Sequence, residues 1–287
     1  MTASATRLDF VAVGPQKAGT TWLDAMLRQH NGVRLPGKVK ETFFFDERFE
    51  RGENWYWAHF TPARAGALNG EVGPSYFDVP QARERLRRHN PGLKVIVSLR
   101  DPVQRAYSLY CHHYGRGRLA GDFGASARAM PRLLESGDYL RHLAGWAADF
   151  GPGSIFLVRQ EDIQQRPAAV LAAVQEFLGL PPQPASGLDE VFNERVQPRS
   201  LGVSRIATAV ARTFRLLGLH RAVDALKKSP LLGAVSRGGK DVFPPLGEAH
   251  AAALRTRYAA EYRWLEQCRF ERGGMRLSEC WPPSPAL

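Results

Sequence analysis

The stretch "LDFVAVGPQKAGTTWLDAM", residues 8–26, joins a short apolar run to a glycine-rich turn and the beginning of a helical pattern. The apolar run ends at Gly14, and its unbroken apolarity predicts a strand covered on both faces, as in a parallel sheet. A glycine-rich turn that leads into a helix presents backbone N–H groups and the positive end of the helix to an anion. These residues therefore predict an α/β fold with a P-loop-like strand–loop–helix nucleotide site.

Strand-like and helical patterns alternate along the chain. Two further apolar runs predict strands at residues 93–99 and 154–158. Helical patterns are found at residues 20–30, 79–89, 105–115, 167–179 and 248–268. Such alternation is typical of a central parallel β-sheet flanked by helices. We expect a single domain over residues 1–287, with a core at about 8–180 and a helical, basic C-terminal part at about 190–287.

The charge of the chain is strongly positive and partly local. Its 287 residues include 39 Lys and Arg against 28 Asp and Glu, a net charge of +11. Residues 205–240 hold eight basic residues and one acidic residue, Asp224. A basic surface attracts nucleic acid, an anionic membrane or a multiply charged small molecule. The segment 203–240 is expected either to form an ordinary amphipathic helix with a solvated face or to make a peripheral contact with an anionic surface or acceptor.

Cysteine content and apolar profile indicate the compartment. The three cysteines, Cys111, Cys268 and Cys280, are too few and too scattered for a disulfide framework or a metal site. No apolar stretch approaches the roughly 20 residues that a membrane span needs. Residues 1–14 lack the pattern of a secretory signal. We expect a cytoplasmic protein with reduced thiols that requires no metal.

The lysine of the loop stands in an unusual position. A P-loop reads G-x-x-x-x-G-K-[ST], and Gly14 and Gly19 match its two glycines. Thr20 occupies the lysine position, whereas Lys17 lies inside the loop, so the ammonium belongs to the anion cradle. No strand ends convincingly in an aspartate that would hold Mg²⁺. A P-loop kinase or other NTPase is therefore an alternative, as is a basic module that binds nucleic acid or an anionic membrane.

Three further stretches carry a specific resemblance. They are "KETFFFD" (40–46), "GEVGPSYF" (70–77) and "SLRDPVQRAYSLY" (98–110). Together with "PQKAGTTWL" they resemble the sulfotransferases that use 3′-phosphoadenosine 5′-phosphosulfate (PAPS), and the heparan-sulfate-type branch in particular. The resemblance covers roughly residues 8–180. It implies PAPS as the donor, 3′-phosphoadenosine 5′-phosphate (PAP) as the product, and no metal or nucleic-acid partner.

The resemblance also implies two anion sites, one for each end of the donor. The 5′ end would be held by Lys17, Ala18, Gly19, Thr20 and Thr21. Arg100 and Ser108 would hold the 3′-phosphate, for which the planar fork of arginine is well suited. "SRGGK" resembles a late loop that closes over the phosphates, which implicates Arg237, Gly238 and Lys240. Trp22 is expected either near the adenine or in the core.

Catalysis is assigned to a base and a cation. The motif "KETFFFD" implies Glu41 as the general base, and the phenylalanines beside it favour a raised pKa through desolvation. Lys17 would stabilise the PAP leaving group. Val72 stands where the heparan-type branch usually has a lysine, and Lys38, Lys40 or residues 236–240 are the candidate substitutes. The acceptor is expected to be a hydroxyl or amine of a saccharide or small natural product, with residues 54–60 and Tyr76 in its cleft or in the core.

Overall fold

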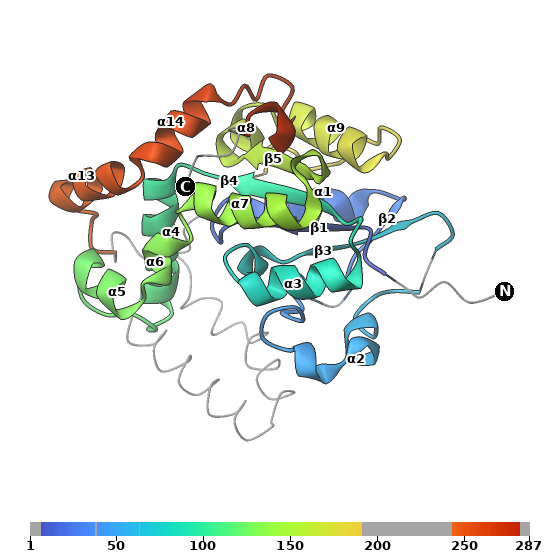
Figure 1. Cartoon of the computed structure of the whole chain (residues 1–287), viewed down its shortest axis with the longest axis horizontal. Helices are drawn as coiled ribbons and strands as arrows, with labels where there is room; N and C mark the ends of the chain where they lie inside the picture. Colours follow the sequence, from blue (N-terminus) through green and yellow to red (C-terminus); the bar gives the residue numbers. More distant parts are fainter. Residues whose placement is uncertain (1–6, 38, 63, 191–242, 282–287) are drawn as a thin grey trace. The chain divides into compact units, whose positions relative to one another are not determined.

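The computed structural model describes residues 7–37, 39–62, 64–190 and 243–281. It divides into two compact units. The first unit comprises Met1–Arg105, Glu135–Phe192 and Tyr258–Leu287, and the second comprises Ala106–Leu134 and Asn193–Arg257. The basic segment 203–240 lies outside the described residues, as do Arg237, Gly238, Lys240 and Lys38. The first unit contains the sheet and the sequence-predicted loop (Figure 1).

A six-stranded sheet forms the centre of the first unit, in the order β2-β3-β1-β4-β5-β6. Every adjacent pair is parallel except β5 and β6, which are antiparallel. The predicted α/β class with a parallel sheet is confirmed, and the antiparallel edge strand is an addition. The strands are β1 (Phe10–Val13), β2 (Val33–Arg34), β3 (Leu68–Val72), β4 (Lys94–Leu99), β5 (Ile155–Arg159) and β6 (Met275–Arg276).

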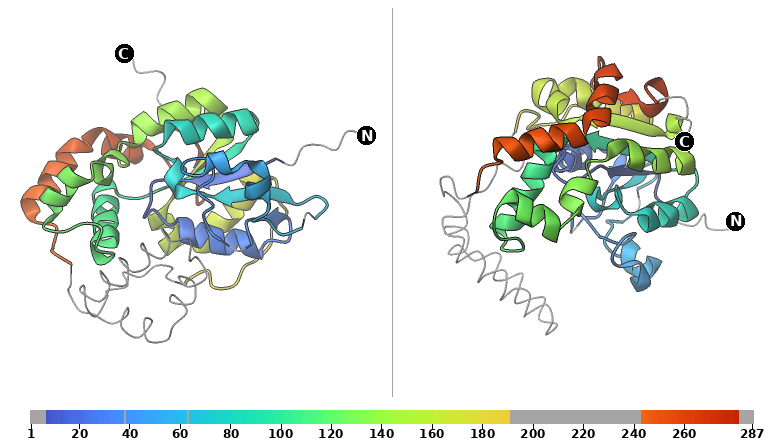
Figure 2. Two further views of the ribbon diagram at one scale, coloured as in Figure 1. Left: turned by 90° about the horizontal axis from the view of Figure 1, so that it is seen from below. Right: turned by 60° about the vertical axis from the view of Figure 1, so that its left-hand side comes forward.

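Helices cover both faces of the sheet, and each face has its own apolar cluster (Figures 1 and 2). One cluster contains side chains of α1 (Thr20–Gln29), α8 (Gln160–Gln165) and α9 (Pro167–Leu178). The other contains side chains of α3 (Pro80–His89), α7 (Tyr139–Phe150) and α14 (Ala259–Gln267). Shorter elements complete the unit: η1 (Phe49–Arg51), α2 (Glu53–Trp57), η2 (Pro74–Tyr76), η3 (Pro152–Ser154) and η4 (Leu277–Glu279).

The second unit is helical in its described residues. It contains most of α4 (Pro102–Gly115), α5 (Phe123–Ala129), nearly all of α6 (Arg132–Glu135) and α13 (Glu248–Arg257). Within it, Asp122 caps α5 by accepting a hydrogen bond from the Ala125 N–H group at 2.7 Å. The Tyr110 hydroxyl donates to the carbonyl of Gly121 at 2.8 Å. The helix predicted at 248–268 is two helices, α13 and α14, which meet at Tyr258.

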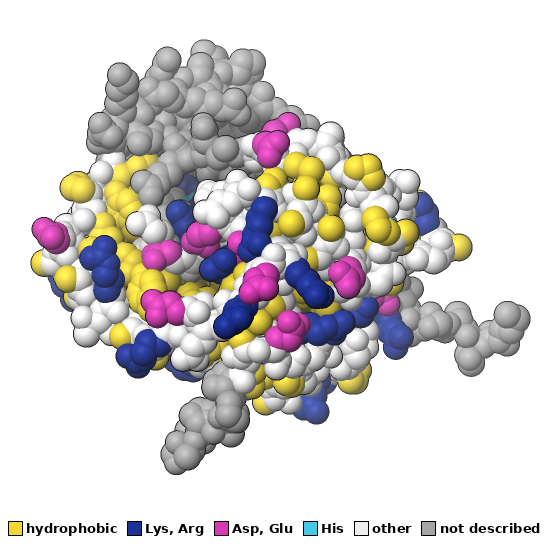
Figure 3. Space-filling view, turned by 90° about the horizontal axis from the view of Figure 1, so that it is seen from above, with side chains coloured by type: hydrophobic (Ala, Val, Ile, Leu, Met, Phe, Trp, Pro, Cys, Tyr) yellow, Lys and Arg dark blue, Asp and Glu magenta, His cyan; other side chains and the backbone are white. Residues whose placement is uncertain are grey.

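The lengths of the helices and the charges on the surface both bear on the possible binding partners. Among the described residues, none of the helices has the length and apolarity that crossing a membrane requires. On the face shown in Figure 3, side chains of Lys and Arg are interspersed with those of Asp and Glu among the residues drawn in colour. The described part of that face therefore mixes charges of both signs.

The sheet order places the predicted loop at a favourable position. Strand β1 lies between β3 and β4. After β1 the chain first forms β2 and β3 on one side of it, and then crosses to form β4 and β5 on the other side. In open α/β sheets, ligands bind beyond the carboxyl ends of the strands where the order reverses in this way. The carboxyl ends of β1, β3 and β4 share this edge.

Candidate active site

The loop between β1 and α1 has the backbone of an anion cradle. Gly14 has φ +142°, and a Cβ there would lie 2.3 Å from the Ser98 carbonyl oxygen, so only glycine fits this close approach to β4. Gly19 is left-handed, with φ +93°, and stands at the N-cap of α1. Lys17 is also left-handed, with φ 77°, which is uncommon for a residue with a side chain. The helix then starts at Thr20 with its positive end at the loop.

The end of β4 supports this loop. Ser98 is fully buried, and its hydroxyl donates a hydrogen bond to the carbonyl of Ala18. Arg100, which follows β4, donates from Nη1 to the carbonyl of Lys17 at 3.3 Å. The Arg100 carbonyl accepts a hydrogen bond from the Tyr139 hydroxyl at 2.7 Å. The structure thus brings together two of the residues that the sequence assigned to separate anion sites, Lys17 and Arg100.

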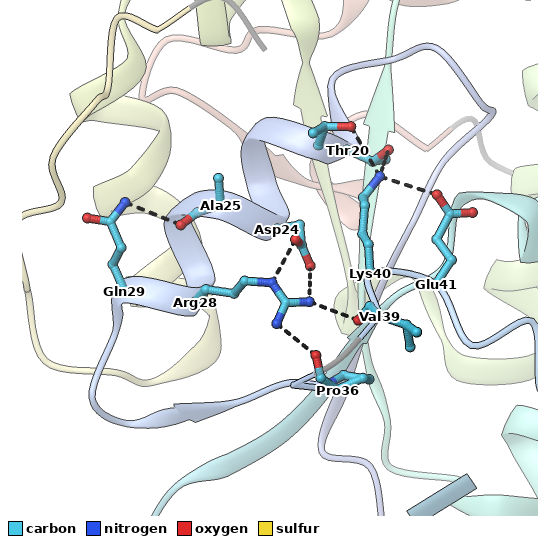
Figure 4. A network of polar contacts seen from close by, with 10 residues as sticks. Thr20, Asp24, Ala25, Arg28, Gln29, Pro36, Val39, Lys40 and Glu41 are labelled. Carbon is cyan, nitrogen blue, oxygen red and sulfur yellow. Dashed lines mark hydrogen bonds and ion pairs between the residues drawn. The ribbon is translucent and has the colours of Figure 1, made fainter. Parts of the chain in front are cut away.

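Lys40 and Glu41 lie directly against the start of α1. The Lys40 ammonium contacts the hydroxyls of Thr20 at 3.4 Å and Thr21 at 3.2 Å. It also pairs with Oε1 of Glu41 at 3.4 Å, and Figure 4 shows it between the α1 hydroxyls and the carboxylate. Burial raises the pKa of the Glu41 carboxyl above its usual range, and the Lys40 ammonium opposes this rise. A partly desolvated carboxylate therefore lies beside the loop.

Two anchors fix the segment that carries this pair. On one side, Arg28 of α1 donates to the carbonyls of Pro36 at 2.7 Å and Val39 at 3.2 Å. Its guanidinium is itself held by Asp24, at 2.8 Å (Figure 4). The guanidinium is planar and offers several donors in a fixed arrangement, so one side chain can fix two carbonyls of a turn. The chain therefore reaches Lys40 from a position set by α1.

The second anchor is Glu71, a fully buried carboxylate in β3. Its Oε1 accepts hydrogen bonds from the Thr42 N–H at 3.0 Å, the Thr42 hydroxyl at 2.5 Å and the Tyr76 hydroxyl at 3.0 Å. Its Oε2 accepts one from the Tyr56 hydroxyl at 2.9 Å. Burial raises the pKa of Glu71, and these hydrogen bonds oppose the rise. Because Thr42 follows Glu41 directly, Glu71 holds the backbone next to the candidate base.

Sequence reasoning did not identify this anchor. "GEVGPSYF" contains Glu71 and Tyr76, but in this motif the family resemblance distinguishes only position 72. The sequence does not predict strand β3, so it gives no sign that Glu71 is buried. In the structure, the buried carboxylate needs hydrogen-bond partners, and it finds them in Thr42, Tyr56 and Tyr76. Tyr56 and Tyr76, which were expected in an acceptor cleft or in the core, are fully buried and bonded to Glu71.

The remaining predicted residues lie in other surroundings. Trp22 is buried in the apolar cluster of the α1 face, and its indole N–H donates to the carbonyl of Leu188 at 2.9 Å. Val72 is buried in the same cluster, so the side chain at this position packs in the core. Ser108 is buried within α4, in the second unit, whereas Arg100 belongs to the first. Arg237, Gly238 and Lys240 are outside the described residues.

The donors gathered at the start of α1 suit an anionic ligand. They comprise the backbone of the loop, two threonine hydroxyls and a lysine ammonium. Within the described ranges, no group of three or more His, Cys, Asp and Glu side chains is placed to hold a metal ion. A phosphate-loop fold in which threonine replaces the usual lysine, with a carboxylate beside the loop, has the groups needed for transfer chemistry on an anionic donor.

Comparison with known proteins identifies the family. The sulfotransferase domain family matches residues 7–203, which is more than half of the chain. The chain therefore belongs to this family.

The relatives include enzymes that modify heparan sulfate, according to their names. The chain is 33% identical over 183 residues to mouse heparan sulfate glucosamine 3-O-sulfotransferase 3B1, which covers 59% of this chain and 45% of that protein. It is 34% identical over 176 residues to human heparan sulfate glucosamine 3-O-sulfotransferase 6, covering 58% of this chain and 51% of that protein. The match to a bifunctional heparan sulfate N-deacetylase/N-sulfotransferase 1 of Caenorhabditis elegans is 27% identical and covers 61% of this chain. The matched regions thus span between 22% and 51% of these relatives.

A solved structure shares the fold. The sulfotransferase from Alicyclobacillus acidocaldarius superposes with a TM-score of 0.55 and 22% sequence identity. The superposition covers 78% of this chain and 100% of that one. This similarity shows that the two chains share a fold.

Proposed function

We propose that this sulfotransferase moves a sulfuryl group from PAPS to a hydroxyl or amine of a saccharide or small natural product. The observation that carries the proposal is the contact of Lys40 with both Glu41 and the hydroxyls at the start of α1. It supports the proposal because a carboxylate lies beside the loop to which we assign anion binding. The relatives' names refer to heparan sulfate, which supports a saccharide among the candidate acceptors.

Binding of the donor requires two anion sites, and the described residues offer a pair close to each other. The loop from Lys17 to Thr21 and the start of α1 would hold the 5′ end. Arg100 would hold the 3′-phosphate through its planar fork. The hydrogen bond from Arg100 to the Lys17 carbonyl supports this arrangement, because it links the two candidate sites. The proposed set also includes Ala18, Ser108, Arg237, Gly238 and Lys240. Trp22, the last member, lies in the apolar cluster of the α1 face.

The chemistry divides between a cation and a base. When bound, PAPS supplies a sulfuryl group whose bond to the bridging oxygen of PAP breaks as the bond from its sulfur to the acceptor oxygen or nitrogen forms. Lys17 stabilises the negative charge that develops on that bridging oxygen. Glu41 takes the proton that the acceptor loses. Burial suits Glu41 to this role, because a raised pKa brings the base closer to the pH at which it works.

The proposal is tested by thermal melting and by transfer of label. We expect PAP to raise the melting temperature in the absence of Mg²⁺, and ³⁵S from labelled PAPS to appear on a member of a panel of saccharides and small natural products that includes heparan sulfate. Stabilisation by ATP with Mg²⁺ alone would indicate a P-loop kinase instead. A response only to DNA or to anionic vesicles would indicate a basic binding module.

A further inference from the structure

Lys40 contacts the loop and the candidate base at once, and this double contact suggests a role distinct from that of Lys17. We propose that Lys40 is a shuttling cation, which pairs with Glu41 before the donor binds and moves onto the sulfuryl oxygens when PAPS is bound. The inference rests on the proposed function, because it takes PAPS as the donor and Glu41 as the base. Beyond the proposed function, it assigns to Lys40 a direct contact with the sulfuryl group during transfer.

The geometry allows this exchange. A lysine ammonium has three N–H donors, and Lys40 directs them to Thr20, Thr21 and Glu41 at 3.4, 3.2 and 3.4 Å. These distances are at the long end of the range for hydrogen bonds, so each contact is weak and easily replaced. The Lys40 side chain keeps 26% of its surface exposed, which leaves room for its flexible stem to move. An anion bound at the α1 hydroxyls would compete directly for this ammonium.

The other cation of the network is held more firmly. Arg28 donates to both carboxylate oxygens of Asp24 and to the carbonyls of Pro36 and Val39, three of these four bonds being between 2.7 and 3.0 Å. It therefore fixes the backbone near the pair, whereas Lys40 has one anionic partner in the described part of the chain, at 3.4 Å (Figure 4). Of the two, Lys40 is the one that can change partners without loosening the segment.

Movement of Lys40 would also change the base. Among the described residues, the charged groups that act on Glu41 are Lys40, whose proximity lowers the pKa of the carboxyl, and Asp46 and Asp24, which raise it. When the ammonium moves to the sulfuryl oxygens, the opposing effect weakens and the carboxylate becomes a stronger base. The strength of Glu41 as a base is thereby coupled to the presence of a sulfuryl group, since PAP has none to attract Lys40.

Calorimetric binding of PAPS and PAP to two variants tests the role of Lys40 without knowledge of the acceptor. Lys40→Met should weaken binding of PAPS about tenfold to a hundredfold, the range expected for one hydrogen bond to a charged group, and change binding of PAP less than about twofold. Lys40→Arg, which keeps the charge, should retain most of the affinity for PAPS. Arg88→Gln removes the same charge from an exposed position on α3 and should leave both affinities unchanged.

Proton uptake gives a second measurement. If Lys40 leaves Glu41, binding of PAPS should take up protons, which calorimetry detects when the titration is repeated in buffers of different ionisation enthalpy. This extra uptake should be lost in both Lys40→Met and Glu41→Gln. Lys40→Gln serves as the second variant if circular dichroism shows that Lys40→Met is unfolded.

The outcomes separate the inference from the proposed function. Equal losses of PAPS and PAP affinity in Lys40→Met, or no loss of either, would overturn the shuttling role while leaving the transfer reaction in place. Proton uptake in Lys40→Met equal to that of the wild type would overturn the shuttling role as well. A wild-type protein that binds neither PAPS nor PAP would instead refute the proposed function.

Discussion

The hydroxyl of Thr42 provides a sharp test of the buried anchor. Thr42→Val replaces this hydroxyl by a methyl group of similar size, and the Glu71 carboxylate loses one of its donors, at 2.5 Å. Glu71 keeps the Thr42 N–H and the Tyr76 hydroxyl, and the Phe44 N–H keeps the Tyr76 hydroxyl as an acceptor at 3.0 Å. The main loss is one hydrogen bond to a charged group, about 1.5–3 kcal/mol of the free energy of unfolding. The Phe44 N–H also loses the Thr42 hydroxyl as an acceptor at 3.1 Å and keeps only the one from Tyr76.

This free energy corresponds to a fall in melting temperature of about 2–5 °C for a chain of 287 residues. Urea denaturation and calorimetry measure it, with Thr42→Ser as the matched control because serine keeps the hydroxyl. The turnover number should fall in Thr42→Val, because the backbone beside Glu41 is less firmly held, while affinity for PAP stays nearly constant. Wild-type stability in Thr42→Val, or an equal loss in Thr42→Ser, would refute the anchoring role of the hydroxyl.

Three further substitutions test the proposed roles in the reaction. Lys17→Ala should lower the turnover number by orders of magnitude, because its charge is needed most in the transition state; near-normal turnover would remove Lys17 from the mechanism. Glu41→Gln should abolish transfer and keep affinity for PAP, and the wild-type rate should fall as the pH drops through the raised pKa of Glu41, at a pH above the usual range for glutamate. Arg100→Ala should weaken PAP about tenfold or more, whereas an unaffected dissociation constant would place the 3′-phosphate elsewhere.

The sequence predicted the elements whose pattern is dominated by apolar residues. The strands expected at 8–14, 93–99 and 154–158 are β1, β4 and β5, because central parallel strands are apolar on both faces. Strand β3, "LNGEV", escaped this rule. Its Gly70 packs against the ring of Phe10, where a Cβ would lie 2.1 Å from the ring, and its Glu71 is buried by virtue of partners far away in the sequence.

The site was predictable where a motif defines the local backbone. The loop around Lys17 is such a motif, since its glycines and the helix that follows determine its shape. The position of Lys40 was not predictable in this way, because it depends on Arg28 and Glu71, which hold the segment from two different elements. From the sequence, Lys38, Lys40 and residues 236–240 were equally good candidates to take the role of the lysine that the family usually has at position 72. Only the fold shows that the Lys40 ammonium contacts the hydroxyls of Thr20 and Thr21.

The two segments to which the chemistry is assigned share an unfavourable backbone conformation. Among the described residues, the non-glycine residues with positive φ are Lys17, at 77°, and Phe43, at 56°. Such conformations cost on the order of 1 kcal/mol or more and persist only where the surroundings enforce them. Near Lys17, Arg100 donates to the carbonyl of Lys17 itself and Ser98 donates to the carbonyl of the next residue. Near Phe43, the N–H of the next residue donates to the hydroxyls of Thr42 and Tyr76. Because the strained residue of one segment is the loop lysine and that of the other lies two positions from Glu41, we infer that the fold gives up stability at both places to fix the cation and the base.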